Sequence, residues 1–151
     1  MRIKNFLFVI LLFATIFSVC YLNSEKEILF ASEKGSYLFA VGSDSSNAKF
    51  YTYSAKNAND AIVKSVARGQ SLFLDFSLVG EEYAIKKANQ IKVEKNAKIL
   101  FCEMGEWGRS EYYYCESIPY YKIIKGKKVN LQISYSLASV CIGSPMIFAS
   151  Y

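Results

Sequence analysis

The 151-residue chain contains no histidine, and this absence removes several common catalytic and metal-binding arrangements at once. Without imidazole there is no serine–histidine–aspartate triad, no cysteine–histidine nucleophile and no histidine-bearing zinc site. The four cysteines show no C-x-x-C spacing, so neither a zinc ribbon nor a thioredoxin-type redox site is expected. The sequence also lacks the glycine-rich patterns that hold nucleotide phosphates. We therefore predict a non-enzymatic protein that carries no cofactor and no metal ion.

An excess of charge of one sign is also missing. The chain has 18 basic and 13 acidic residues, and Arg2 and Lys4 supply part of the difference. Beyond residue 20 there remain 16 basic and 13 acidic residues, because the first twenty contain two basic residues and no acidic one. This balance is too even for a nucleic-acid-binding surface, so no nucleic-acid partner is predicted.

A long apolar run is present at the N-terminus. Arg2 and Lys4 precede the mostly apolar residues 6–19, a pattern typical of an export signal. Cleavage after Cys20 would release the domain, and lipidation of Cys20 is a second possibility. Without either event, residues 6–22 would form a short membrane anchor whose basic end stays in the cytoplasm.

All three outcomes place the remaining chain outside the cytoplasm, secreted or anchored to the outer face of the cytoplasmic membrane. We therefore divide the sequence into a signal peptide or N-terminal membrane anchor, residues 1–22, and one domain, residues 23–151. The length suits a single domain, and the 52% of hydrophobic residues can supply its core. Disulfides can persist in this compartment.

The stretch 71–95 reads as a strand followed directly by an amphipathic helix. Apolar residues alternate along 71–78, which is the period-two pattern of a strand with one buried face. Gly80 ends this pattern, and Glu81 and Glu82 then stand where a helix N-terminus favours negative charge. The apolar positions that follow recur at helical spacing until about Lys92.

Similar patterns predict the other elements. A compact helix is expected from Asn57 to near Gly69. Residues 28–31 and 37–41 are expected to pair as a hairpin, and Lys125-Gly126 to lie in a turn. Further strands are predicted at 50–53, 99–104, 111–118, 129–135, 139–142 and 146–151. The predicted fold class is α+β, with a mostly antiparallel sheet and two helices packed on one face.

The clearest predicted hairpin turns at Gly108-Arg109, a pair suited to a type II′ turn. This register places Cys102 directly opposite Cys115, within reach of a disulfide. We predict this bond and leave Cys141 as a free thiol. A bond between Cys115 and Cys141 is the alternative if the last strands lie beside this hairpin.

Tyrosine is abundant on the predicted strands, and lysines cluster near it. An exposed row of these side chains could bind a glycan, an anionic envelope polymer or a protein. The alternative is that tyrosine is simply a good strand residue, with its ring packed and its hydroxyl in water. The residues of this possible binding surface are Tyr112, Tyr114, Tyr120, Tyr121, Lys125, Lys127 and Lys128.

Three short motifs carry a family resemblance. They are Lys86-Lys87-Ala88-Asn89-Gln90, Val129-Asn130-Leu131-Gln132-Ile133, and Ile142-Gly143-Ser144-Pro145-Met146-Ile147 running to the terminal Ser150-Tyr151. With these motifs, in this order, the chain resembles the YwmB family, exported proteins of Gram-positive and often spore-forming bacteria. The resemblance implies a curved antiparallel sheet with helices on one face, similar to the TATA-box-binding protein fold. It carries over no catalytic residues and does not imply DNA binding.

Together these observations predict an exported, envelope-side protein that is not an enzyme and binds a protein or a cell-wall component. Its contact with the membrane would run through the N-terminal segment, if that segment is uncleaved. The alternative is an extracytoplasmic enzyme or a thiol-reactive protein with a site that uses no histidine. The thiol-reactive function would require Cys141 to be exposed near positive charge.

Overall fold

The structure is a computed structural model that describes residues 28–42, 47–106 and 108–148. The predicted signal or anchor, residues 1–22, lies outside the described residues, as do residues 149–151 at the end of the last predicted strand. Within the described ranges, no helix is both long enough and apolar enough to cross a membrane.

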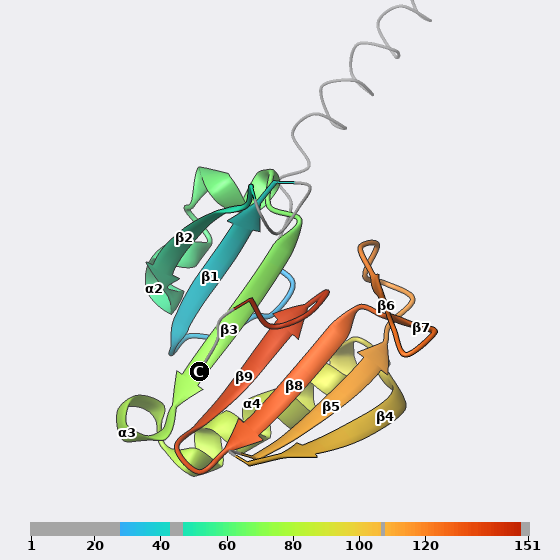
Figure 1. The fold of residues 1–151 in the computed structure, drawn as a ribbon. Helices are drawn as coiled ribbons and strands as arrows, with labels where there is room; N and C mark the ends of the chain where they lie inside the picture. The colour runs from blue at the N-terminus through green and yellow to red at the C-terminus, as the bar shows by residue number, and fades with distance from the viewer. Residues whose placement is uncertain (1–27, 43–46, 107, 149–151) are drawn as a thin grey trace, which may run out of the picture.

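Seven strands form one antiparallel sheet in the order β2-β1-β3-β9-β8-β5-β4, and β6 and β7 form a separate hairpin (Figure 1). The predicted α+β class and the antiparallel sheet are confirmed. The strands are β1 (Ser36–Val41), β2 (Lys49–Ser54), β3 (Gly69–Asp75), β4 (Lys98–Gly105), β5 (Gly108–Tyr114), β6 (Lys122–Ile124), β7 (Lys127–Val129), β8 (Leu131–Ser136) and β9 (Ser139–Ser144). The helical segments are α2 (Ala55–Ala58), η1 (Ile62–Ser65), α3 (Phe76–Val79) and α4 (Glu81–Glu94).

The helix α4 covers one face of the sheet, behind β9, β8 and β5 in Figure 1. It forms where the sequence predicts it, with Glu81 and Glu82 in its first turn. Ala84, Ala88 and Ile91 are fully buried, and they share one core cluster with the apolar side chains of the central strands. Small residues at two of these positions let the helix lie close to the sheet.

The strand before α4 ends earlier than predicted. The carboxylate of Asp75 accepts a hydrogen bond from the amide of Ser77 at 2.8 Å, and this cap starts the short helix α3. Leu78, predicted to lie in the strand, is instead exposed on α3. Gly80 joins α3 to α4 with a φ of +86°, a conformation that costs glycine little.

The first predicted helix, from Asn57 to near Gly69, is wrong as a single element. The chain forms the short helices α2 and η1 instead, with Asn59 and Asp60 between them. Asparagine and aspartate compete with helical hydrogen bonds through their own side chains, and Ala61 is extended. Both pieces still pack against the same core cluster as α4, through Ala55 and Ala58 of α2 and the partly buried Val63 of η1.

The predicted hairpin between residues 28–31 and 37–41 is also wrong, because only the second segment forms a strand. Residues 28–31 run without regular structure along the core, where Phe30 is fully buried and its carbonyl accepts a hydrogen bond from the Tyr37 hydroxyl. The amide of Leu29 donates to the side-chain oxygen of Gln70 at 2.9 Å, which ties this segment to the start of β3.

The end of the described chain crosses the sheet rather than extending it. Residues 146–148 form no strand, and the amide of Ile147 donates to Gln132 Oε1 at 3.0 Å. This crossing passes directly over Gly143, where a Cβ would lie 2.4 Å from the Ile147 nitrogen. Glycine is therefore required in the middle of β9 by a close approach of backbone to backbone.

The two faces of the sheet follow from its register. Paired residues point to the same face, and one row of pairs crosses five strands through Leu72, Ile142, Ile133, Glu111 and Cys102. This row lies on the side of α4, which we call the helix-covered face. The row one residue along belongs to the other side, which we call the open face: Phe73, Cys141, Ser134, Ser110 and Glu103.

Candidate binding site

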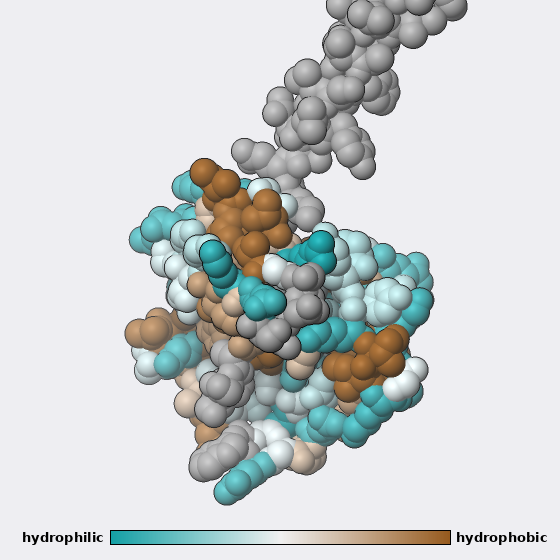
Figure 2. Space-filling model, turned by 45° about the horizontal axis from the view of Figure 1, so that its top comes forward, coloured by the Kyte–Doolittle hydropathy of each residue, from teal (hydrophilic) through white to brown (hydrophobic). Residues whose placement is uncertain are grey.

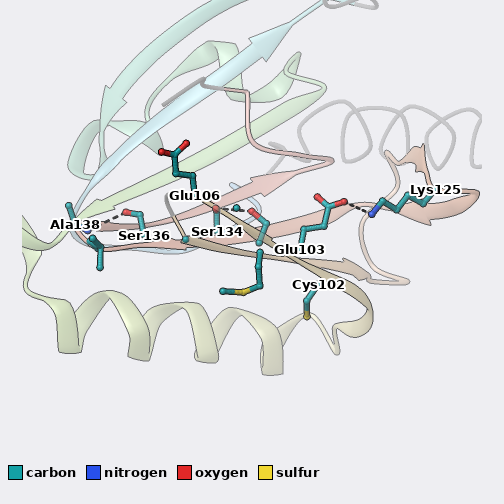
Figure 3. A pocket seen from close by; sticks show the side chains of 12 residues that line it. Cys102, Glu103, Glu106, Lys125, Ser134, Ser136 and Ala138 are labelled. Atoms are coloured by element: carbon teal, nitrogen blue, oxygen red, sulfur yellow. Dashed lines mark hydrogen bonds and ion pairs between the residues drawn. The ribbon is translucent and has the colours of Figure 1, made fainter.

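A broad depression of about 1130 Å³ lies at the ends of β4, β5 and β8 and extends over the open face (Figure 3). The side chains of Ser110, Ser134 and Ser136 line it from β5 and β8, and Glu103 lines it from β4. Lys125, from the turn of the β6–β7 hairpin, closes one side. We call this depression the open-face groove.

Serine hydroxyls form much of the polar lining of the groove. Ser110 Oγ and Ser134 Oγ lie 2.9 Å apart on paired strands. Ser136 Oγ accepts hydrogen bonds from the amides of Ala138 and Ser139 at 3.2 and 3.0 Å. A hydroxyl both donates and accepts, so this row can serve a ligand that carries amide or hydroxyl groups.

A charged pair lies beside the serines. The ammonium of Lys125 is 2.6 Å from Glu103 Oε1 (Figure 3). The Tyr112 hydroxyl donates to Glu103 Oε2 at 2.8 Å. The hydrogen bond from Lys125, and to a smaller extent the one from Tyr112, holds the pKa of Glu103 below its ordinary value. Burial, together with the Glu103 carboxylate, raises the pKa of Tyr112 to about 12. At neutral pH the groove therefore contains a carboxylate matched by an ammonium group.

Leu137 is the exposed apolar side chain of the groove, whereas Met104, paired with Arg109, points to the helix-covered side of β4. Met104 near the end of β4 is 78% exposed, and Leu137 in the turn between β8 and β9 is 96% exposed. Exposed apolar side chains beside hydrogen-bonding groups are typical of sites whose ligand has both an apolar and a polar surface.

The structure places the seven residues of the predicted binding surface in different surroundings. Tyr112 is only 9% exposed, because its ring stacks on Phe101 with a centroid distance of 4.5 Å. The ammonium groups of Lys125 and Lys127 lie 5.4 and 5.8 Å from the centroid of the same Phe101 ring. These residues hold the β6–β7 hairpin against β4, so Tyr112 is a packing residue as well as a neighbour of the groove.

The remaining tyrosines lie further along the hairpin and its approach. Tyr120 and Tyr121 are exposed and line a second, smaller depression of about 210 Å³. The ammonium of Lys128 lies 4.7 Å from the centroid of the Tyr121 ring. Tyr114 is half-buried at the end of β5, opposite Lys98.

The β6–β7 hairpin itself turns where the sequence predicts. Lys125 and Gly126 form its two-residue turn, and both have positive φ values of 49° and 74°. Two consecutive positive φ values are those of a type I′ turn, whose twist matches that of paired strands. The turn presents the Lys125 side chain to Glu103.

The predicted disulfide between Cys102 and Cys115 is wrong, because the hairpin has a different register. Gly105 pairs with Gly108, so the chain reverses before Gly108-Arg109, and Cys102 lies opposite Glu111. A bulge between Ile99 and Phe101 shifts the pairing once more. Cys102 and Cys115 are both free thiols, which also excludes the alternative bond from Cys115 to Cys141 in this structure.

The thiols differ sharply in exposure. Cys115 and Cys141 are fully buried, whereas Cys102 is exposed on the edge strand β4, where its side chain points to the helix-covered side, away from Glu103 (Figure 3). Burial raises the pKa of Cys115 to about 11, so its reactive thiolate form is disfavoured. The exposure that a thiol-reactive function would require of Cys141 is contradicted.

Sequence reasoning missed a polar cluster on the helix-covered face. Glu111 is almost fully buried, forms an ion pair with Arg109 and accepts a hydrogen bond from the Tyr113 hydroxyl. Lys92 on α4 approaches the same carboxylate at 3.7 Å, and burial followed by the nearby Arg109 lowers the pKa of Lys92. The two cations and the hydroxyl keep the buried carboxylate paired, which makes it part of the fold.

Sequence reasoning also missed the three serines of the groove. Their only signal is alternation, since Ser110, Ser134 and Ser136 stand on strand positions that face away from the apolar ones. Among the described residues, no group of three or more cysteine, aspartate or glutamate side chains could hold a metal ion. The predicted absence of a cofactor stays a prediction.

The site belongs to an α+β protein with a groove on the open face of an antiparallel sheet. Comparison of the chain with protein-family models, with curated proteins and with solved structures finds no match in any of the three. The resemblance to the YwmB family therefore stays a prediction.

Proposed function

We propose that this chain is an extracytoplasmic, non-enzymatic binding protein whose open-face groove holds a cell-wall component or a segment of a protein. It would be secreted, or held at the outer face of the cytoplasmic membrane by its N-terminal segment. The observation that carries the proposal is the groove itself, with its hydroxyl row, its charged pair and the exposed Leu137 at its end.

The chemistry of the groove favours a polar ligand without a large net charge. Lys125 already pairs with Glu103, and Glu106 adds an exposed negative side chain, so a polyanion would meet repulsion there. Sugar hydroxyls and peptide groups can exchange hydrogen bonds with the serines while their carbon faces contact Leu137. A saccharide or a short peptide of the envelope fits this combination.

We also propose the finer assignment of the fold and family. The seven-stranded antiparallel sheet with α4 on one face agrees with a fold similar to the TATA-box-binding protein, and the motif order agrees with the YwmB family. A thiol-reactive function is the second candidate, because Cys102 is an exposed thiol on the edge strand β4.

A titration of the full chain in solution tests the proposal. Soluble cell-wall saccharides and wall peptides are added in turn, and binding is followed by calorimetry. Ser134→Trp fills the groove and should weaken binding at least about tenfold, since the ligand loses its contact surface. Thr52→Trp, on the exposed edge strand β2, is the matched control and should bind normally.

The outcomes separate the candidates. Unchanged affinity in Ser134→Trp, with a native circular-dichroism spectrum, would show that the groove is not the site. Cys102→Ser should leave binding intact. A loss of binding in this variant would favour the thiol-reactive function.

A further inference from the structure

The second depression lies at the end of the sheet where β1 ends, β3 begins and the β6–β7 hairpin stands, the upper end in Figure 1. Arg68, Tyr120, Tyr121 and Lys122 line it, and Lys128 lies over the Tyr121 ring. We call these five residues the basic aromatic rim. The 137–138 turn, which lines the open-face groove, lies at the other end of the strands.

The charge of the rim has one sign. None of the residues that line the depression is acidic, whereas Arg68 and Lys122 are both basic. The ammonium of Lys122 lies 5.9 Å from the Phe148 ring centroid, so it stands over an aromatic surface. Asp44 belongs to residues 43–46, outside the described part of the chain.

Exposed apolar side chains accompany the basic ones at this end. Ile62 on η1 is 87% exposed, and Val66, two residues before Arg68, is also exposed. Ile123, directly after Lys122, is 61% exposed. Figure 2 tilts this end toward the viewer and shows separate apolar areas among hydrophilic residues. Apolar, tyrosine and lysine or arginine side chains together are typical of proteins that sit at the headgroup level of a bilayer.

The first described residues are tied to the start of β3, the strand whose first residue lines the depression. Leu29 is hydrogen-bonded to Gln70, whose neighbour Gly69 lines the depression. Leu22, the last residue of the apolar N-terminal segment, lies six residues before Ile28 in the sequence. Six residues span at most about 20 Å even when fully extended. An anchor formed by residues 6–22 would therefore hold the rim close to the lipid surface.

From this combination we infer that the basic aromatic rim docks the folded domain onto anionic phospholipid headgroups. Lysine and arginine are attracted to the negative surface, and the exposed isoleucines and tyrosines enter the headgroup layer. A lipid surface fits better than a soluble polyanion because the exposed apolar residues and the nearby anchor accompany the charge. The inference depends on the proposed extracytoplasmic location and is independent of the ligand in the groove.

Hydrogen–deuterium exchange of the full, uncleaved chain tests the inference. The chain is reconstituted into vesicles of phosphatidylcholine alone, or of equal parts phosphatidylcholine and phosphatidylglycerol. We expect amides of residues 62–68 and 120–124 to exchange at least about fivefold more slowly in the anionic vesicles. The turn at 137–138, at the far end of the sheet, should exchange equally in both.

Charge reversal provides the matched comparison. Lys122→Glu combined with Lys128→Glu should abolish the added protection, whereas Lys86→Glu, on the exposed side of α4, should retain it. Native exchange rates in β8 confirm that each variant is folded. Equal protection in both kinds of vesicle, or protection that survives in the double variant, would overturn the inference.

One further arm separates lipid from polymer. A soluble polyphosphate is added to the chain in phosphatidylcholine vesicles, and the same amides are followed. Unchanged exchange agrees with lipid docking, whereas protection equal to that of the anionic vesicles would assign the rim to a polymer and contradict the inference. The titration of the open-face groove is performed without vesicles, so its outcome does not depend on lipid docking by the rim.

Discussion

The same strands form both faces of the sheet, but one face is covered by helices and the other carries the open-face groove. On the helix-covered face, Leu72, Ile133 and Ile142 are fully buried beneath α4 and the short helices. On the open face, Ser110 and Ser134 occupy the neighbouring row and line a groove. Because side chains alternate along a strand, one residue of displacement separates the buried face from the face that carries the proposed binding groove. Substitutions on the open face should therefore affect the proposed binding while leaving stability almost unchanged.

The largest expected effect comes from two adjacent residues of β8. Ile133→Ala removes a fully buried side chain and should lower the free energy of unfolding by about 2–5 kcal/mol. Ser134→Ala removes one hydroxyl from the open face and should change it by less than about 1 kcal/mol. Urea unfolding of both variants measures the difference. Equal losses would contradict the division between the two faces.

An intermediate effect is expected at alkaline pH from the buried thiol. The pKa of Cys115 is about 11 in the fold against an ordinary value of 9.0, so the folded state keeps the proton more tightly. This contribution is complete below pH 9 and is lost as the pH rises toward 11; it amounts to about 2–3 kcal/mol.

Urea unfolding at several pH values compares the wild-type chain with Cys115→Ala. The variant should lose less stability between pH 9 and pH 11, since its ionising thiol is gone. Iodoacetamide offers a parallel comparison, because the exposed Cys102 should be alkylated in the native state while Cys115 reacts only after unfolding. Rapid native alkylation of Cys115 would contradict its burial.

The smallest expected effect belongs to the charged pair of the open face. Lys125→Met removes the partner of Glu103 and should change the free energy of unfolding by less than about 1 kcal/mol, because the pair is exposed. The pKa of Glu103 should rise toward its ordinary value, since its main hydrogen-bond donor is lost. In the wild type, the lowered pKa of Glu103 stabilises the fold at pH values above the ordinary pKa of a glutamate. This stabilisation is lost as the pH falls through the lowered pKa. Carboxyl NMR of Glu103 measures the shift.

Local patterns predict the parts of this fold whose physical cause is local. The helix α4 follows from its periodicity and its acidic first turn, and β8 follows from the alternation of Leu131, Ile133 and Tyr135. The Lys125-Gly126 turn is predicted because few residues accept its positive φ values. In each case the residues that set the element lie within the element.

The missed features depend on contacts between residues that are distant in the sequence, or on single side chains that bond to the backbone and interrupt a strand. The register of β4 and β5 is set by pairing at Gly105 and Gly108 and by the bulge before Phe101, and neither leaves a pattern in the sequence. The strand predicted at 129–135 is divided at Asn130 into the end of β7 and β8, because the buried Asn130 side chain bonds to the backbone of Cys115 and Ile118. The groove arises only when the serines of separate strands meet.

The bulge in β4 has a consequence for the solubility of the molecule. β4 is a margin of the sheet, where unpaired backbone groups could recruit a strand from another copy and start a fibre. The extra residue at Leu100 distorts this margin, and its carbonyl already accepts a hydrogen bond from Lys127 Nζ at 3.0 Å. A ladder of intermolecular bonds cannot run unbroken past that point. The β6–β7 hairpin, through Lys127, therefore protects this edge strand against pairing with another copy.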